Sequence, residues 1–251
     1  MFFAVDVGNS NIHVGLFTQT KPVKTFIFPC GKQGLNQFFF FLKKYRDIKG
    51  LILSDAYGTT RISKISELKE LTKGFDNYIL LTPETDCGLK IKYNPKSSLG
   101  TDRIANCVAA HTIYQRDCLV VDFGTATTFN MVSKEGEFLG GLILPGITSI
   151  YNAYPQHLIK NINVKNLKRK PDVCAFSTSQ AVNFGVYYTF IGAVEKIKQE
   201  IEMKLKRKVY TIAAGGGVKF IPKSNMLFDD IDRNLTLKGL AIIYKRLSER
   251  R

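Results

Sequence analysis

Two segments of the chain end an apolar run with an acid, a glycine and several small polar residues. The first is AVDVGNSNIHVGLF at Ala4–Phe17, and the second is VVDFGTATTF at Val120–Phe129. In both segments a glycine follows the acid two residues later, and glycine lets the backbone take φ > 0 and approach a ligand closely. Successive backbone N–H groups in such a turn form a concavity that binds anions. The two segments therefore predict a duplicated phosphate-binding turn.

The side chains of these turns add further ligands for a phosphate group. A carboxylate beside a phosphate normally requires a cation between them, so Asp6 and Asp122 could hold Mg²⁺, its water molecules or a monovalent ion. Two ordinary hairpins with Asx-type turns are the alternative, and either motif taken alone favours it. The pair, joined by a third glycine cluster at Ala213–Gly217, favours nucleotide binding. The additional donors are the hydroxyl and amide groups of Asn9, Ser10, Asn11, Thr125, Thr127 and Thr128.

The segment YNPKSSLGTDR at Tyr93–Arg103 contains a second set of reactive side chains. A positioned carboxylate such as Asp102 can accept the proton of an alcohol that attacks phosphorus. The neighbouring Arg103 has a planar fork that suits a substrate carboxylate. The alternatives are an N-cap role for Asp102 before the following helix and a surface ion pair for Arg103. The sequence has no GxxxxGK[ST] loop, no GxGxxG after a strand and no GxSxG elbow, so nucleotide binding would use the two turns.

Length and composition limit the class of protein. The 251 residues suffice for one large domain or two domains of ordinary size. No apolar run reaches the roughly 18–20 residues of a membrane helix, and the N-terminus does not resemble a signal peptide. We therefore expect a cytoplasmic protein that does not enter a membrane. The five cysteines include no CxxC pair and the three histidines are scattered, which argues against a disulfide framework and a structural zinc site.

The chain is strongly basic, with a formal net charge of +15 and a pI near 9.6. Such a charge favours anionic partners, which include nucleic acids, phosphates and carboxylates. The densest basic groups, Lys160–Lys170 and Lys204–Lys208, are not interleaved with the aromatic residues typical of single-strand binding. No helix-turn-helix or zinc-finger signature occurs. We interpret the charge as a solvated basic surface and expect no specific nucleic-acid partner.

The elements that must position these residues follow a strand, turn and helix pattern that begins twice, with a boundary near Gln115–Asp117. In the first half we expect a hairpin at Met1–Phe17, strands at Val23–Phe28, Gly50–Ser54 and Tyr78–Leu81, and helices at Leu35–Arg46, Thr60–Lys73 and Ile104–Tyr114, the last with Thr101 or Asp102 near its N-cap. In the second half we expect strands at Cys118–Asp122, Phe129–Ser133, Gly136–Ile147 and Val209–Ala213, a turn at Gly124–Thr128, and helices at Leu235–Leu247 and Thr178–Leu205, which Gly192 could interrupt.

The glycine turns and the late glycine cluster resemble the actin-like ATPase superfamily of sugar kinases, acetate kinases and Hsp70 chaperones. Within it, five segments in order resemble the type III pantothenate kinase family: DVGNSN, GTDRIAN, VDFGTATTF, GGLILPGI and LTLKGL. The resemblance runs from Asp6 to about Gly239, and GTDR followed by DFGTATT is its most specific part. It implies an α/β fold of two ribonuclease-H-like domains, at residues 1–115 and 116–251, with an active-site cleft between them. It also implies a homodimer.

The same resemblance implies an activity and a set of site residues. The activity is ATP-dependent phosphorylation of pantothenate to 4′-phosphopantothenate, the first step of coenzyme A biosynthesis. Asp102 would be the catalytic carboxylate, and Asp122 would bind K⁺ or NH₄⁺. Contacts to the ATP phosphates and Mg²⁺ are implied for Asp6, Val7, Gly8, Asn9, Ser10, Asn11, Ile12, His13 and Thr125, with Asp6 toward the metal. Contacts to pantothenate are implied for Tyr93, Gly100, Thr101, Asp102, Arg103 and Thr178, the last across a dimer interface.

The sequence departs from the family pattern at three places. Ser10 stands where the family usually has threonine, which keeps the hydroxyl. Asn130 stands where aspartate is common, which keeps an acceptor but loses the charge. The proline after Tyr93 comes one place earlier than the pattern, although the spacing to Gly100 fits. His13 is expected to contribute its backbone rather than its imidazole.

Two other functions remain open from the sequence. One is a different small-molecule kinase of the same superfamily, since a fold does not determine a substrate; GTDR separates the two interpretations. The other is a DNA-binding transcriptional accessory factor, which the net charge suggests and the missing DNA-binding motifs oppose.

Overall fold

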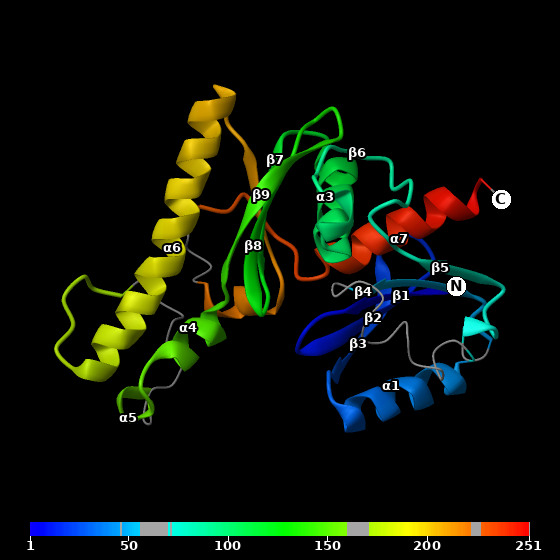
Figure 1. The fold of residues 1–251 in the computed structure, drawn as a ribbon, viewed down its shortest axis with the longest axis horizontal. Helices are drawn as coiled ribbons and strands as arrows, with labels where there is room; N and C mark the ends of the chain where they lie inside the picture. The colour runs from blue at the N-terminus through cyan, green and yellow to red at the C-terminus, as the bar shows by residue number, and fades with distance from the viewer. Residues whose placement is uncertain (46, 56–69, 71, 160–170, 222–226, 251) are drawn as a thin grey trace. The chain divides into compact units, whose positions relative to one another are not determined.

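A computed structural model of the chain describes residues 1–45, 47–55, 70, 72–159, 171–221 and 227–250, and it is mixed α/β (Figure 1). These residues form two compact units. Unit 1 comprises Met1–Gln115, Glu135–Leu139 and Asn234–Arg251, and unit 2 comprises Arg116–Lys134 and Gly140–Arg233. The predicted division at 115/116 coincides with the start of unit 2. The predicted C-terminal domain, 116–251, differs, because two of its segments pack with unit 1.

Unit 1 is built on a five-stranded sheet with the order β3-β2-β1-β4-β5. β1 pairs antiparallel with β2 and parallel with β4, and β4 pairs parallel with β5. The expected hairpin and strands are therefore present, and the first turn lies at the carboxyl end of β1. The strands are β1 (Phe2–Val7), β2 (Asn11–Phe17), β3 (Pro22–Pro29), β4 (Gly50–Asp55) and β5 (Asn77–Leu80).

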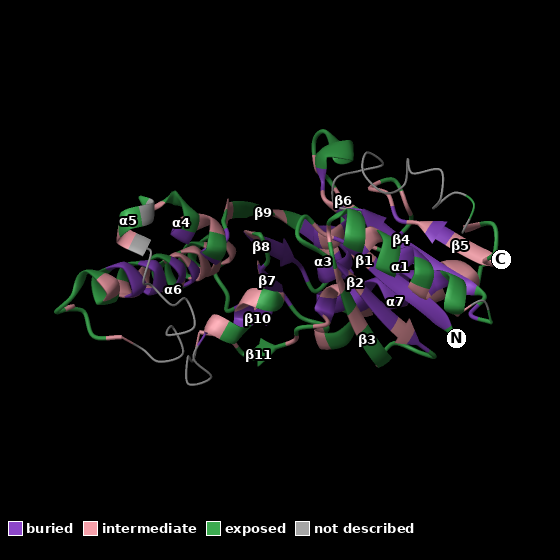
Figure 2. Cartoon of the chain, turned by 90° about the horizontal axis from the view of Figure 1, so that it is seen from below, coloured by how far each residue is buried: buried purple, intermediate pink, exposed green. Residues whose placement is uncertain are grey.

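Side chains of β1 alternate between the two faces of this sheet, as in any strand. Phe3, Val5 and Val7 pack with residues of α1 in one buried cluster (Figure 2). Phe2 lies on the opposite face, where its ring stacks on Tyr244 of the C-terminal helix with centroids 4.1 Å apart. By this alternation Asp6 shares the face of Phe2, the face covered by α7.

The elements of unit 1 that the structure describes also include three α-helices and one short 3-10 helix. α3 begins at Thr101 with Gly100 as its N-cap, so Thr101 and Asp102 lie next to the N-cap, as predicted. Both residues belong to the first turn of α3, and the alternative that Asp102 is itself the N-cap is wrong. The helices are α1 (Lys32–Lys44), η1 (Lys96–Ser98), α3 (Thr101–Tyr114) and α7 (Leu235–Ser248).

Unit 2 has a sheet in which β7 lies between β10, a parallel neighbour, and β8, an antiparallel one. Its strand order is β11-β10-β7-β8-β9. The first residues of β9 pair with β6 within unit 1, and Ile91 lies beside Phe138 in that ladder. The strands are β6 (Lys90–Ile91), β7 (Cys118–Phe123), β8 (Ala126–Val132), β9 (Glu137–Pro145), β10 (Tyr210–Ala214) and β11 (Asp230–Ile231).

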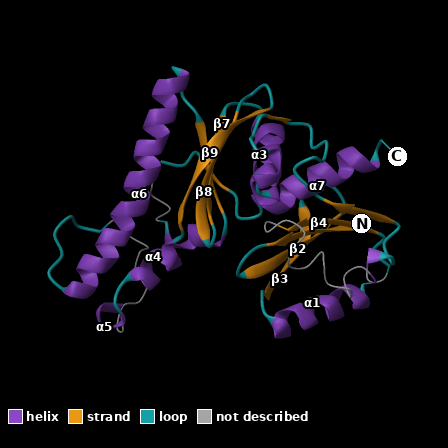
Figure 3. Cartoon of the chain, viewed as in Figure 1, coloured by secondary structure: helices purple, strands orange, loops and turns teal. Residues whose placement is uncertain are grey.

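One face of the unit 2 sheet is covered by helix α6 (Figure 3). Leu119, Val121 and Phe123 of β7 share a buried cluster with Val186 and Phe190 of this helix. The helix runs without interruption, so the expected break near Gly192 is absent. The helices are α4 (Ile147–Ala153), α5 (Gln156–Ile159), α6 (Thr178–Leu205) and the 3-10 helix η3 (Gly216–Phe220).

Two of the sequence predictions fall largely outside the described residues. They are the helix at Thr60–Lys73, of which only a few residues are described, and the basic group Lys160–Lys170. Within the described part of the chain, no helix is both long enough and apolar enough to cross a membrane.

Candidate functional site

The first turn connects β1 to β2 and is closed by backbone hydrogen bonds. Gly8 N–H donates to Asn11 O over 3.0 Å, and a Cβ on Gly8 would lie only 3.2 Å from that oxygen. From the end of β3, Cys30 donates its N–H to Ser10 O and its thiol to Gly8 O. The turn therefore has a defined shape, with Asn9, Ser10 and Asn11 exposed to solvent at its tip.

The second turn repeats this construction in unit 2. Gly124 N–H donates to Ala126 O over 3.1 Å, and a Cβ on Gly124 would again lie 3.2 Å from the acceptor. Both β1 and β7 are six-residue strands in which only the fifth residue is not fully buried. That residue is Asp6 in β1 and Asp122 in β7. The two units thus present one carboxylate each, next to a glycine turn.

The third glycine cluster packs against the end of β7. Gly215 takes φ of +83°, and a Cβ there would collide with Asp122 Oδ1 and with the backbone of Phe123. A Cβ on Gly217 would also lie within 2.7 Å of Phe123 O. Glycine is required here because the backbone approaches the second turn too closely for any side chain.

Several predicted turn residues can contribute only their backbone. Val7 and Ile12 have buried side chains in the core of unit 1. Thr127 and Thr128 lie in β8 and are buried, so the expectation that their hydroxyls serve the turn is wrong. Thr128 Oγ1 instead accepts from Asn130 Nδ2 over 2.9 Å, inside the strand. Thr125 remains as the exposed hydroxyl of this turn.

The backbone carbonyl of Thr125 holds the second turn to the start of α4. It accepts hydrogen bonds from Gly146 N–H and from the Ser149 hydroxyl, both over 3.1 Å. A Cβ on Gly146 would collide with this carbonyl. The Pro145–Gly146 pair at the end of β9 therefore supports the turn.

Asp102 lies in the first turn of α3, where the N-terminal end of a helix favours a negative charge. Burial nevertheless raises the pKa of its carboxyl group, and this effect exceeds the lowering by the backbone N–H of Arg103 and by its guanidinium charge. A Cβ on Gly100 would collide with Asp102 Oδ1. The carboxylate consequently lies against a backbone that only glycine permits.

Arg103 is buried, with 4% of its surface exposed, beside a pair of aromatic rings. Its guanidinium carbon lies 5.6 Å from the ring centroid of Tyr93 and 5.6 Å from that of Phe138. The two rings meet edge to face, with centroids 5.9 Å apart. Stacking on aromatic faces holds a guanidinium plane in one orientation. The alternative of a surface ion pair for Arg103 is therefore excluded.

Two residues that the sequence analysis did not select belong to this arrangement. Phe138 was expected only as part of a strand, and Ser54 only as the end of a buried strand. The Ser54 hydroxyl donates to Asp6 Oδ1 over 3.1 Å and lies 2.9 Å from Thr101 Oγ1. A serine followed by an aspartate at the end of the apolar run GLIL was the available signal.

The remaining predicted residues have different positions. His13 is opposite Asp6 in the β1–β2 ladder, and burial lowers the pKa of its imidazole. A neutral imidazole agrees with the expectation that His13 contributes backbone. Thr178 is the exposed first residue of α6 in unit 2. The predicted residues Asp6, Thr101, Asp102, Arg103 and Tyr93 all belong to unit 1, and Asp122 and Thr125 to unit 2.

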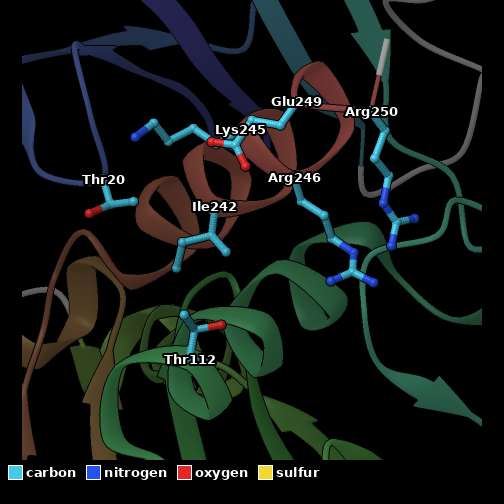
Figure 4. Close-up of a pocket in the computed structure, with 7 residues that line it drawn as sticks. All are labelled: Thr20, Thr112, Ile242, Lys245, Arg246, Glu249 and Arg250. Atoms are coloured by element: carbon cyan, nitrogen blue, oxygen red, sulfur yellow. The ribbon is translucent and has the colours of Figure 1, made fainter.

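A cavity of about 530 Å³ in unit 1 contains none of the predicted residues (Figure 4). Helix α7 and the two residues that follow it provide most of the lining of this cavity. Two of its arginines, Arg246 and Arg250, also form ion pairs with Asp86. The lining residues are Thr20, Thr112, Ile242, Lys245, Arg246, Glu249 and Arg250.

The residues present fit a magnesium ion held together with phosphate. Among the described residues, no group of three histidine, cysteine, aspartate or glutamate side chains could enclose a metal. Mg²⁺ is commonly bound by one or two carboxylates, water and substrate phosphates rather than by a full protein cage. A single carboxylate at Asp6, beside a glycine turn, matches that pattern.

Solved structures of similar fold include a hexokinase. A chain from Campylobacter jejuni, whose description names the Baf family of transcriptional activators, is 25% identical with a TM-score of 0.64 and covers 99% of this chain and 100% of its own. A ROK hexokinase from Thermus thermophilus is 11% identical, with a TM-score of 0.55. The match covers 98% of this chain and 99% of the hexokinase chain. The fold is thus the actin-like ATPase and sugar kinase fold that the glycine turns suggested.

Sequence comparison is more specific. The profile of the type III pantothenate kinase family matches residues 2–200. A type III pantothenate kinase from Syntrophobacter fumaroxidans is 33% identical over 254 residues, which span 98% of this chain and 98% of the relative. GTDR and DFGTATT, the most specific of the recognised segments, both fall inside the matched region. With its two glycine turns and its adjacent Asp102 and buried Arg103, the chain belongs to the type III pantothenate kinase family.

Proposed function

We propose that this chain transfers the γ-phosphate of ATP to the terminal hydroxyl of pantothenate, with Asp102 as the catalytic base. Membership of the family supports the reaction. The observation that supports the site is the adjacency of Asp102, with its raised pKa, and Arg103, whose guanidinium lies against the rings of Tyr93 and Phe138. One residue handles the proton of the substrate and the next binds its negative charge.

Arg103 is the group that binds the pantothenate carboxylate. A guanidinium offers two parallel N–H donors, which match the two oxygens of a carboxylate. Tyr93 and Phe138 fix the plane of the fork before substrate arrives, so little side-chain entropy is lost on binding. Gly100 and Thr101 lie at the same helix start and contribute contacts to the substrate. Thr178 is proposed as a further contact.

Asp102 accepts the proton of the attacking hydroxyl as the oxygen approaches phosphorus. Phosphoryl transfer requires mainly positioning and charge stabilisation, with a base that orients the nucleophile. A base is most effective when its pKa lies near the working pH. Burial moves the pKa of Asp102 in that direction, and the neighbouring Arg103 charge keeps the carboxylate accessible to ionisation.

The two turns hold the phosphates of ATP. In the first turn, the backbone from Val7 to His13 and the exposed side chains of Asn9, Ser10 and Asn11 are the phosphate ligands, with Asp6 toward Mg²⁺. Thr125 contacts the nucleotide and Asp122 binds a monovalent cation, K⁺ or NH₄⁺. Bound Mg²⁺ would neutralise charge that develops on the phosphate oxygens. We also propose that the chain acts as a homodimer in the cytoplasm, where ATP is available.

The test is transfer of the γ-phosphate from ATP to pantothenate in K⁺ buffer with Mg²⁺. Wild-type protein should turn over, and Asp102→Asn should lose about 10²- to 10⁴-fold in kcat, the usual contribution of a positioned base. Asp47→Asn, an exposed aspartate on the same unit, is the matched control and should keep full activity. ATP binding without turnover of pantothenate would refute the proposed substrate. Phosphorylation of acetate or a sugar instead would favour another kinase of the superfamily.

A further inference from the structure

We propose that Ser54 is a positioning residue that joins the Asp6 carboxylate to the first turn of α3. Its hydroxyl donates to Asp6 Oδ1 over 3.1 Å and lies 2.9 Å from Thr101 Oγ1. The side chain is fully buried, with 0% of its surface exposed. The inference rests on the proposed function, in which Asp6 faces Mg²⁺. In that function Asp102, the residue next to Thr101, faces the substrate.

The direction of these hydrogen bonds follows from the number of protons available. A serine hydroxyl has one proton, whereas an ionised carboxylate can only accept. Ser54 therefore gives its proton to Asp6, and Thr101 must donate to the Ser54 oxygen. The result is a one-way chain from the Thr101 hydroxyl through Ser54 to the carboxylate. Its last bond ends on a charge, which makes it stronger than a bond between neutral groups.

The fold explains why three distant residues meet. β1 and β4 are parallel neighbours, and Asp6 lies directly beside Ser54 in their register. Side chains at one level of adjacent strands share a face, here the face on which α3 and α7 pack. Thr101 reaches the same point because it is the first residue of α3. Burial of both hydroxyls excludes water as a competing partner.

The consequence for metal binding is that the Asp6 carboxylate has a defined orientation. A carboxylate that ligates a metal is commonly held by a further hydrogen bond, and loss of that bond typically costs 10- to 100-fold in metal affinity or activity. Ser54 donates this bond to Asp6. The bond also gives a reason for a buried serine directly after the apolar run Gly50–Leu53 of β4.

The consequence for the substrate side is that the same serine restrains the start of α3. Thr101 has 4% of its surface exposed, and its hydroxyl is committed to Ser54. Asp102 is the next residue along the helix. A shift of the helix start would move the base relative to its substrate, and small misplacements of this kind lower kcat substantially.

The experiment compares wild type, Ser54→Ala and Ser133→Ala, a second buried serine outside the proposed site. Calorimetry measures ATP binding over a series of Mg²⁺ concentrations, and the pantothenate assay gives kcat over the same series. Ser54→Ala should raise the Mg²⁺ concentration for half-maximal ATP binding by about tenfold and lower kcat. Ser133→Ala should leave both unchanged, even where it lowers thermal stability. Ser54→Cys, which has a weaker donor, should give an intermediate shift and replaces Ser54→Ala if that variant does not fold.

The outcomes separate this inference from the proposed function. An unchanged Mg²⁺ dependence in both Ser54 variants would overturn the role of Ser54 even if pantothenate is the substrate. Wild-type protein that binds ATP with Mg²⁺ but leaves pantothenate unmodified would refute the substrate, and the binding series would still decide the role of Ser54. ATP binding by wild type that does not depend on Mg²⁺ would overturn the positioning role.

Discussion

At the scale of single residues, the proposed catalytic role of Asp102 opposes stability. The helix start and the neighbouring guanidinium favour its charged form, yet burial raises the pKa of its carboxyl above the ordinary value of 3.8. In the unfolded chain this group ionises at its ordinary value. Between the two pKa values, the folded protein retains a proton that the unfolded chain has released. The free energy of unfolding therefore falls as pH rises through this interval.

Asp102→Asn should lower the activity but raise the stability of the protein. The variant should have a higher free energy of unfolding than wild type near neutral pH, because a neutral amide avoids the burial penalty of the charge. The gain should shrink as pH falls toward 3.8, where the wild-type carboxyl is itself neutral. Urea denaturation of both proteins across this pH range measures the difference. Equal or lower stability of the variant near neutral pH would contradict the assignment of burial as the dominant cause.

The same pKa shift predicts the acid side of the activity profile. Since the base must be ionised, kcat/KM should decline on acidification with an apparent pKa above 3.8, the ordinary value of aspartate. Initial rates at saturating ATP and low pantothenate concentration, over a pH series in which the protein stays folded, provide the measurement. A decline centred at or below 3.8 would show that Asp102 is not shifted in solution.

At the scale of elements, the main feature is the packing of α7 against α3, the helix that carries the proposed substrate-binding residues. α7 packs along α3 and across β1 and β4, as Figure 1 shows for the red and green helices of unit 1. The close approach requires Gly239, where a Cβ would collide with the carbonyl of Ala105. Leu237 and Leu240 beside it are buried. The C-terminal helix therefore holds α3, and with it Asp102, in place.

A pair of glycine variants tests this contact. Gly239→Ala should lower the free energy of unfolding by about 1–3 kcal/mol, because overpacking forces helices apart. Gly192→Ala, in the exposed interior of α6 with no atom within 4 Å of the added Cβ, should instead raise it by roughly 0.5–1 kcal/mol through helix propensity. Thermal and urea denaturation of the two variants give the comparison. Equal effects would mean that helix propensity, and not packing on α3, decides both.

At the scale of the whole molecule, the net charge of +15 is the feature that the catalytic site does not use. In the basic group Lys204–Lys208, several charges are already paired within unit 2. Arg207 Nε lies 2.6 Å from Asp117 Oδ2, and Lys208 Nζ lies 2.8 Å from Glu202 Oε2. These pairs favour a solvated basic surface over a nucleic-acid site.

We therefore expect only weak and nonspecific binding to duplex DNA. Fluorescence anisotropy with two unrelated duplexes should give similar affinities that fall steeply with salt, since the binding would arise from counterion release. Little binding should remain at about 0.15 M salt. Tight binding to one sequence at that salt concentration would contradict this expectation and support a role in transcription.

The sequence by itself determined the local parts of this protein. The two acid-glycine turns, the strands that carry them, the bounds of α6 and the Asp102–Arg103 pair all depend on residue types at short spacing. Such features have a physical cause within a few residues, such as the φ freedom of glycine or the alternation of a strand. The family resemblance rested on the same short segments. For this reason residue types and their spacing were sufficient to select the fold class and to predict the site residues.

Only the tertiary structure decided which distant residues support them. Ser54 bonds to Asp6 and Thr101, Phe138 stacks on Arg103, and α7 joins unit 1, although each is far away in sequence from its partner. The tertiary structure also places Thr127 inside β8. The pairing of β7 with β8 already includes Thr127, which the sequence pattern had assigned to the turn at Gly124–Thr128. Contacts of this kind arise from packing of one element on another. No local pattern of residues specifies them, because the same serine or phenylalanine could equally have ended an ordinary buried strand.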